Sequence, residues 1–106
     1  MNVIGIVAHK GEIMEGMSAN GEWARQTIVV TTQGDKPSNV PVEFFGKRKV
    51  KDIQPINVGD MVQVFFTING REHDGRWFAT LDGGTVYLLR RQSSKDIDQI
   101  TTIQEY

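Results

Sequence analysis

Runs of alternating apolar and polar residues, separated by turn-forming Gly, Asn and Asp, recur along this chain and leave little room for helices. In one run Val62, Val64 and Phe66 would share one face of a strand. Gln63 and Thr67 would lie on the opposite face, because side chains alternate along a β-strand. The same pattern, rich in β-branched and aromatic residues, predicts strands over residues 2–8, 22–32, 40–45, 61–69 and 76–81, the last continuing over 85–89.

The segments between these runs indicate how the strands are connected. Residues 10–21 contain several glycines and end in an Asn-Gly turn dipeptide, so we interpret them as a long connecting loop. Residues 70–75 are interpreted as the polar tip of a hairpin. Only residues 47–53 favour a short helix, which Pro55 would end. This order predicts an all-β fold, a five-stranded OB-fold Greek-key barrel with a short helix between strands 3 and 4.

The composition agrees with one small domain. The 106 residues include no cysteine, which excludes disulfides, thiolate zinc sites and cysteine nucleophiles and fits a reducing, cytoplasmic location. Neither a secretory leader nor an apolar run long enough to cross a bilayer is evident. We expect residues 1–91 to form the OB-fold domain. Residues 92–106 would be a C-terminal tail, either a poorly ordered extension or a short helix, since Ile97, Ile100 and Ile103 recur at steps of three.

Residues that could support catalysis are scarce. His9 and His73 are the only two histidines, and they show neither metal-ligand nor catalytic-triad spacing. The sequence contains no phosphate-binding loop, dinucleotide fingerprint or nucleophile elbow. We therefore expect a protein that is not an enzyme and that needs no metal and no cofactor.

The aromatic residues are more informative, because a nucleobase can stack on any exposed aromatic ring. Alternation along residues 40–45 would bury Phe44 in the barrel and turn Phe45 outward. Phe45 would then either stack on a base or be covered by a subunit partner or the tail. Trp23 and Trp77 each open a strand beside an arginine, and they would either close an end of the barrel or stack on a ligand.

The charged residues restrict the kind of nucleic acid that fits. The net charge of −1 argues against a protein that holds duplex DNA mainly through its phosphates. The one dense basic cluster, Lys47, Arg48 and Lys49 with Lys51, is either a solvated helix face or a set of phosphate contacts next to Phe45. Arg71 and Arg76 flank the last hairpin, which OB folds use to grip single strands.

These motifs resemble the bacterial single-stranded DNA-binding proteins over about residues 3–89. The most specific match is the step Phe45-Gly46-Lys47. The other matching segments are residues 3–5, 20–21, 28–32, 42–44, 59–62, 70–71 and 75–77. The resemblance implies an OB fold, a base-stacking position at Phe45 and assembly into a homodimer or homotetramer.

A still closer resemblance is carried by residues 21–23 with Gln26, 58–60, 71–72 and 75–78. These segments are similar to those of a family of short, uncharacterised bacterial OB-like domains, which has no activity to transfer. The chain also departs from the single-strand binders. Asn39 stands where they have a stacking tryptophan, and the last hairpin is expected to be shorter than theirs, with His73 near its tip.

Together these observations predict a non-catalytic OB-fold module that binds single-stranded DNA or RNA by stacking and phosphate contacts. One alternative is a protein-interaction or oligomerisation module with no nucleic-acid ligand, and another is a module that binds an oligosaccharide or small ligand. No membrane contact is expected. The predicted nucleic-acid-binding residues are Trp23, Phe45, Lys47, Arg48, Lys49, Arg71, Arg76 and Trp77.

Overall fold

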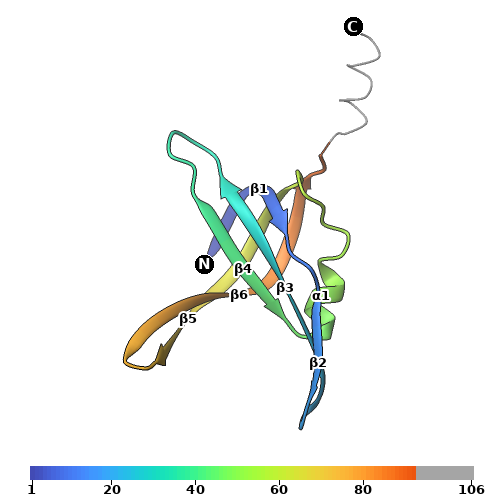
Figure 1. Cartoon of the computed structure of the whole chain (residues 1–106). Coiled ribbons are helices and arrows are strands. Elements are labelled where there is room, and N and C mark those ends of the chain that lie inside the picture. Colours follow the sequence, from blue (N-terminus) through green and yellow to red (C-terminus); the bar gives the residue numbers. More distant parts are fainter. Residues whose placement is uncertain (93–106) are drawn as a thin grey trace, which may run out of the picture.

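The structure, a computed structural model, describes residues 1–92. Five strands pair edge to edge and close a small barrel (Figure 1). The strands of the ring follow one another in the order β1, β5, β6, β4 and β3, and β1 pairs with β3 to close it. Only the contact between β4 and β6 is parallel, where Glu43 faces Asp82. The elements are β1 (Asn2–Lys10), β2 (Met14–Ser18), β3 (Gly21–Thr32), β4 (Asn39–Phe45), α1 (Lys47–Asp52), β5 (Met61–His73) and β6 (Arg76–Arg90).

This arrangement is the predicted OB-type barrel, with α1 between the fourth and fifth strands of the chain and packed against β3 and β4. The expected tail, residues 92–106, falls outside the described residues except for its first member. Within residues 1–92 no helix is long and apolar enough to cross a membrane.

The core confirms the alternation that the sequence predicts. Val42 and Phe44 are fully buried, whereas Phe45 on the same strand is 58% exposed. Phe44 can enter the centre because Gly83 of β6 has no side chain, since a Cβ there would lie 2.4 Å from the phenyl ring. The buried cluster comprises Val7, Ile28, Val30, Val42, Phe44, Ile53, Ile56, Val62 and Val64.

The interpretation of residues 10–21 as a loop is wrong. Met14 to Ser18 form β2, which pairs with the first residues of β3, so that only residues 19–20 make the turn. Because β2 and the start of β3 extend past the barrel, most of their side chains remain exposed and no apolar alternation is needed. We call this hairpin, residues 14–25, the β2–β3 arm (Figure 1).

The last hairpin is also longer than predicted. The ladder between β5 and β6 continues to the pair His73 and Arg76, and β6 runs through the glycines at 83 and 84 without a break. Its turn is the dipeptide Asp74-Gly75, whose φ angles of 53° and 79° suit the tight turns that match strand twist. We call residues 67–82 the β5–β6 arm, which leaves the barrel as a second projection (Figure 1).

Two charged side chains fasten the segment after α1 and the end of β6 to the barrel. The ammonium group of Lys10 donates to three backbone carbonyls within residues 53–56, at 2.8–3.1 Å. The fully buried carboxylate of Asp60 accepts the backbone N–H groups of Asn57 (2.8 Å) and Gln92 (2.7 Å). These contacts fix the segment after α1 and the end of β6, which leaves the arms as the exposed part of the fold.

Candidate nucleic-acid interface

Two aromatic rings lie side by side on the outer face of β3 and β4. Arg25 is paired with Phe45 across the two strands, and Trp23 lies two residues before Arg25 on the same face. The rings of Trp23 and Phe45 are nearly parallel, with centroids 6.3 Å apart and an angle of 14° between their planes. The rings are stacked with an offset, and Phe45 is exposed whereas Trp23 is half-buried. We call this pair the aromatic platform.

The position of Trp23 depends on a glycine in the β2–β3 arm. Gly16 is paired with Trp23, and the indole lies directly over it. A Cβ at Gly16 would be 2.4 Å from Cζ2 of the indole, which is far inside van der Waals contact. The guanidinium carbon of Arg25 lies 5.7 Å from the centre of the indole, within cation–π distance. Gly16 could not be recognised from the sequence, because a glycine in an expected loop gives no sign of a ring above it.

A pocket of ≈ 510 Å³ opens beside the aromatic platform. Its wall is the turn of the β2–β3 arm, and its floor includes both rings. The lining combines aromatic faces, one guanidinium and polar groups of the turn, which suits a planar ligand with polar edges. The lining residues are Ser18, Asn20, Gly21, Glu22, Trp23, Arg25 and Phe45.

The two cations beside the platform both have a carboxylate partner. The ammonium group of Lys47 donates to Glu22 at 2.5 Å, and Arg25 lies 3.8 Å from Glu43. The hydrogen bond from Lys47 lowers the pKa of Glu22, and the same hydrogen bond raises the pKa of Lys47. Both groups therefore stay charged at neutral pH. Side chains of all four residues remain substantially exposed.

The structure divides the predicted basic cluster between two surfaces. Lys47 binds Glu22, which lines the pocket beside the platform. Arg48 and Lys49 instead line a separate pocket of ≈ 490 Å³ between α1 and residues 84–86. The ammonium group of Lys49 donates to the carbonyl of Gly83 at 2.9 Å. Of the three predicted phosphate contacts on α1, only Lys47 is thus placed beside Phe45.

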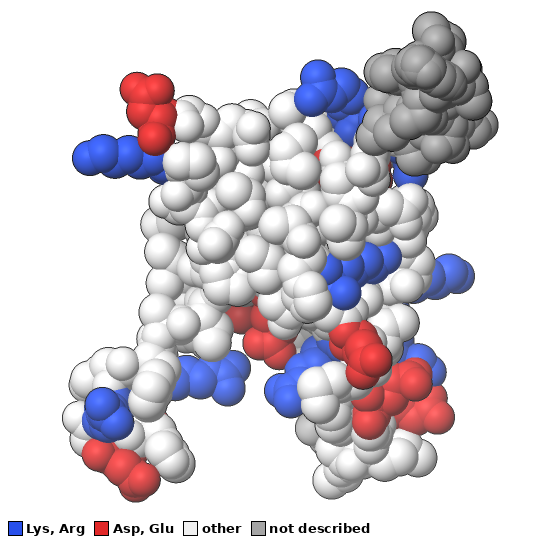
Figure 2. Space-filling model, turned by 45° about the horizontal axis from the view of Figure 1, so that its top comes forward, with Lys and Arg blue, Asp and Glu red and all other residues white. Residues whose placement is uncertain are grey.

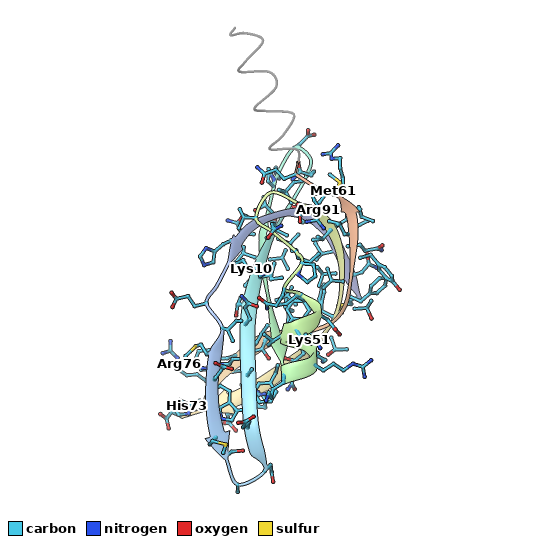
Figure 3. The ribbon with its side chains drawn as sticks, turned by 90° about the vertical axis from the view of Figure 1, so that its right-hand side faces the viewer. Lys10, Lys51, Met61, His73, Arg76 and Arg91 are labelled. Atoms are coloured by element: carbon cyan, nitrogen blue, oxygen red, sulfur yellow. The ribbon has the colours of Figure 1, made fainter. Side chains whose placement is uncertain are left out.

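The register of the β5–β6 arm separates Trp77 from the predicted arginines. Directly paired residues share a face, so Arg71 lies with Phe78, and His73 lies with Arg76, on one face of the arm. Trp77 projects from the other face, where it packs over Gly70. Figure 3 shows His73 and Arg76 close together at the end of the arm.

Two expectations about the tryptophans need correction. Trp77 is 72% exposed on the β5–β6 arm and closes no end of the barrel. Trp23 lies against Phe45 and not across a barrel end. The aromatic residue that shares a face with the arginines of the β5–β6 arm is Phe78, which is 51% exposed and was not among the predicted contacts.

The two arms border a hollow in the surface. Figure 2 shows basic side chains on the sides of both arms that face this hollow, with acidic side chains above it and elsewhere on both arms. Glu43 and Pro41 of β4 lie between the arms, where they line a pocket of ≈ 370 Å³ with residues 79–81. A chain that crossed from the platform to the β5–β6 arm would pass over this region. Among residues 1–92, no group of three or more His, Asp or Glu side chains is placed to hold a metal ion.

A second exposed apolar patch lies on the outer face of β1, β5 and β6, away from the platform. The rings of Phe65 and Tyr87 meet edge to face, with centroids 5.9 Å apart. Ile4 and Leu89 add two further side chains that are about half exposed, at 48% and 47%. We call these four residues the apolar patch.

A model of one sequence family matches most of the chain. The model of a family described as "Domain of unknown function (DUF3127)" matches residues 2–86. This chain belongs to that family. The finding agrees with the resemblance to short uncharacterised domains, and the family description assigns no activity. None of the curated proteins matches the chain.

Two solved structures that share this fold are of single-stranded DNA-binding proteins. The mitochondrial single-stranded DNA-binding protein Rim1 of S. cerevisiae superposes with a TM-score of 0.68 at 16% sequence identity. The superposition covers 86% of this chain and 95% of Rim1. The small single-stranded DNA-binding protein of Streptomyces coelicolor gives a TM-score of 0.53 at 20% identity, over 83% and 89% of the two chains. At these identities the likeness establishes the OB fold.

Proposed function

We propose that this chain is a non-catalytic module that binds single-stranded DNA or RNA on the aromatic platform. The observation that carries the proposal is the nearly parallel pair of the exposed Phe45 and the half-buried Trp23, with Arg25 over the indole and Lys47 bound to Glu22 of the adjoining pocket. A base that stacks on one such ring typically gains about 1–3 kcal/mol, whatever its identity. The known single-strand binders with the same fold support this choice of ligand.

The charges beside the platform suit a single strand better than a duplex. Arg25 and Lys47 can each contact one phosphate of a strand whose bases stack on the rings. Arg71 and Arg76 on the β5–β6 arm provide two more cations across the hollow. A duplex keeps its bases stacked inside, so it would offer the protein phosphates alone, and a chain with a net charge of −1 gains little from those.

Tryptophan fluorescence tests the proposal directly. In a Trp77→Phe variant Trp23 is the only tryptophan, and oligo-dT should quench its emission because a thymine stacks on the indole. Log K should also fall with log salt, at a slope of about −0.7 for each phosphate charge that binding neutralises. Emission that does not change with oligo-dT at low salt would contradict the proposal. A duplex of equal length is the control and should compete poorly.

The apolar patch supports a second candidate function, self-assembly. Ile4, Phe65, Tyr87 and Leu89 bear no charge, and Asn2 and Gln63 beside them already hydrogen-bond to each other at 3.2 Å. A face of this kind suits another copy of the same face. We propose that the chain forms a homodimer or homotetramer through the apolar patch, leaving the aromatic platform free.

Light scattering after size exclusion tests the assembly. We expect a mass of two or four chains for the wild type, and the mass of one chain for a variant with Tyr87→Lys and Leu89→Lys. Oligo-dT should leave the number of chains unchanged, because the platform and the apolar patch lie on different strands. A wild-type protein that is monomeric at high concentration, or that dissociates when oligo-dT binds, would contradict this assignment.

A further inference from the structure

The cations beside the aromatic platform are already occupied by the protein's own carboxylates. Lys47 of α1 contacts Glu22 of the β2–β3 arm, two elements that are distant in sequence. Arg25, which lies over the Trp23 ring, contacts Glu43 on the neighbouring strand. Both carboxylates therefore occupy positions around the platform where the phosphates of a bound strand would also be attracted.

Such exposed ion pairs hold weakly, so a ligand can displace them. The displaced carboxylate nevertheless stays at the site, because Glu22 lines the pocket beside the platform and Glu43 lies on β4 two residues before Phe45. A phosphate that takes over Lys47 or Arg25 would then replace one anion with another. The exchange leaves the local charge balance almost unchanged, so charge alone gives little gain in affinity.

We propose that Glu22 and Glu43 compete with ligand phosphates for Lys47 and Arg25, so that the site rejects polyanions that carry no base. This inference rests on the proposed function, in which stacking on the platform supplies the binding that the phosphates do not. The two glutamates are specificity-determining residues of that site. The depressed pKa of Glu22, caused first by its hydrogen bond from Lys47, keeps this competitor ionised at neutral pH.

The test uses a double variant, Glu22→Gln with Glu43→Gln, and a control double variant, Glu12→Gln with Asp35→Asn. Both add the same charge to the chain, but Glu12 and Asp35 take no part in the ion pairs of the platform. Each protein is titrated calorimetrically with long-chain inorganic polyphosphate and, separately, with oligo-dT at several salt concentrations. Circular dichroism confirms that all three proteins keep the same strand content.

The wild type should bind polyphosphate weakly or not at all. Each removed carboxylate should strengthen a contact between a phosphate and a cation by about five-fold, so the double variant should gain about 25-fold over the control for polyphosphate. For oligo-dT its salt slope should steepen by about 1.4, because two more cations would neutralise phosphates at about 0.7 each.

Carboxylate competition and base stacking on the platform predict different outcomes. A double variant that binds polyphosphate no better than the control overturns the competition, even if the wild type binds oligo-dT. A gain for polyphosphate together with no oligo-dT binding by any protein supports the competition and rejects the proposed base stacking. An unchanged salt slope for oligo-dT in the double variant would also count against the competition.

Discussion

Replacing Phe44 with alanine is expected to lower the free energy of unfolding by about 3–5 kcal/mol, the usual cost of removing a buried phenyl ring. Phe44 is fully buried and lies against the backbone of Gly83 in β6. The neighbouring strand cannot collapse into the vacated space without breaking the contact between β4 and β6, where Glu43 faces Asp82. Urea denaturation followed by circular dichroism would measure the loss.

The next residue in the chain provides a matched variant with the opposite expectation. Phe45→Ala should change stability by well under the loss for Phe44→Ala, because the Phe45 ring is 58% exposed. It should instead weaken oligo-dT binding by about 5- to 150-fold, which corresponds to the roughly 1–3 kcal/mol of one stacked base. Comparable losses of stability in the two variants would place Phe45 in the core. Normal oligo-dT binding by a folded Phe45→Ala protein would remove the platform from the proposed site.

The barrel could be predicted from the sequence because its strands are buried on one side only. Val42 and Phe44 face inward and Phe45 faces outward, so apolar residues recur at every second position of the buried face. The short helix could be predicted for a similar reason, since Pro55 limits its length. Burial thus left a readable pattern in the parts of the chain that form the core.

The arms left no such pattern. Residues 14–18 are exposed or half-exposed on both sides of β2, and their strand exists because they pair with β3. The residues of the β5–β6 arm beyond the barrel are likewise mostly exposed. A run of residues that has no buried face carries no alternation, so its length could not be predicted from hydrophobic periodicity.

One feature of the site was accessible to sequence reasoning and was missed. A two-residue turn at Asp74-Gly75 fixes the register of the whole arm, which pairs His73 with Arg76 and Arg71 with Phe78. That register places Trp77 and Arg76 on opposite faces, although they are adjacent in sequence. The contact of the Trp23 indole with Gly16, by contrast, depends on the pairing of β2 with β3, and β2 was not predicted from the sequence.

The contact between the Trp23 indole and Gly16 should matter for binding. Gly16→Val should weaken oligo-dT binding by roughly 10- to 100-fold, the range expected when one stacking ring is lost. The clash is with the far end of the Trp23 side chain, so the indole can swing away and the strand can persist. Valine also favours β-strands more than glycine does, which makes unfolding of β2 a poor explanation for the loss.

The neighbouring residue supplies the control. Met17 is on the same strand but pairs with Glu22, so its side chain points away from the face that carries Trp23 and Arg25. Met17→Val should therefore leave oligo-dT binding within about two-fold of the wild type, because valine at this position meets no ring. In the Trp77→Phe background, Gly16→Val should also shift the emission of Trp23 toward that of a solvated indole and reduce its quenching by oligo-dT. If Gly16→Val leaves both the emission and the affinity unchanged, Trp23 does not need its contact with Gly16, and the platform cannot be the surface on which the strand stacks.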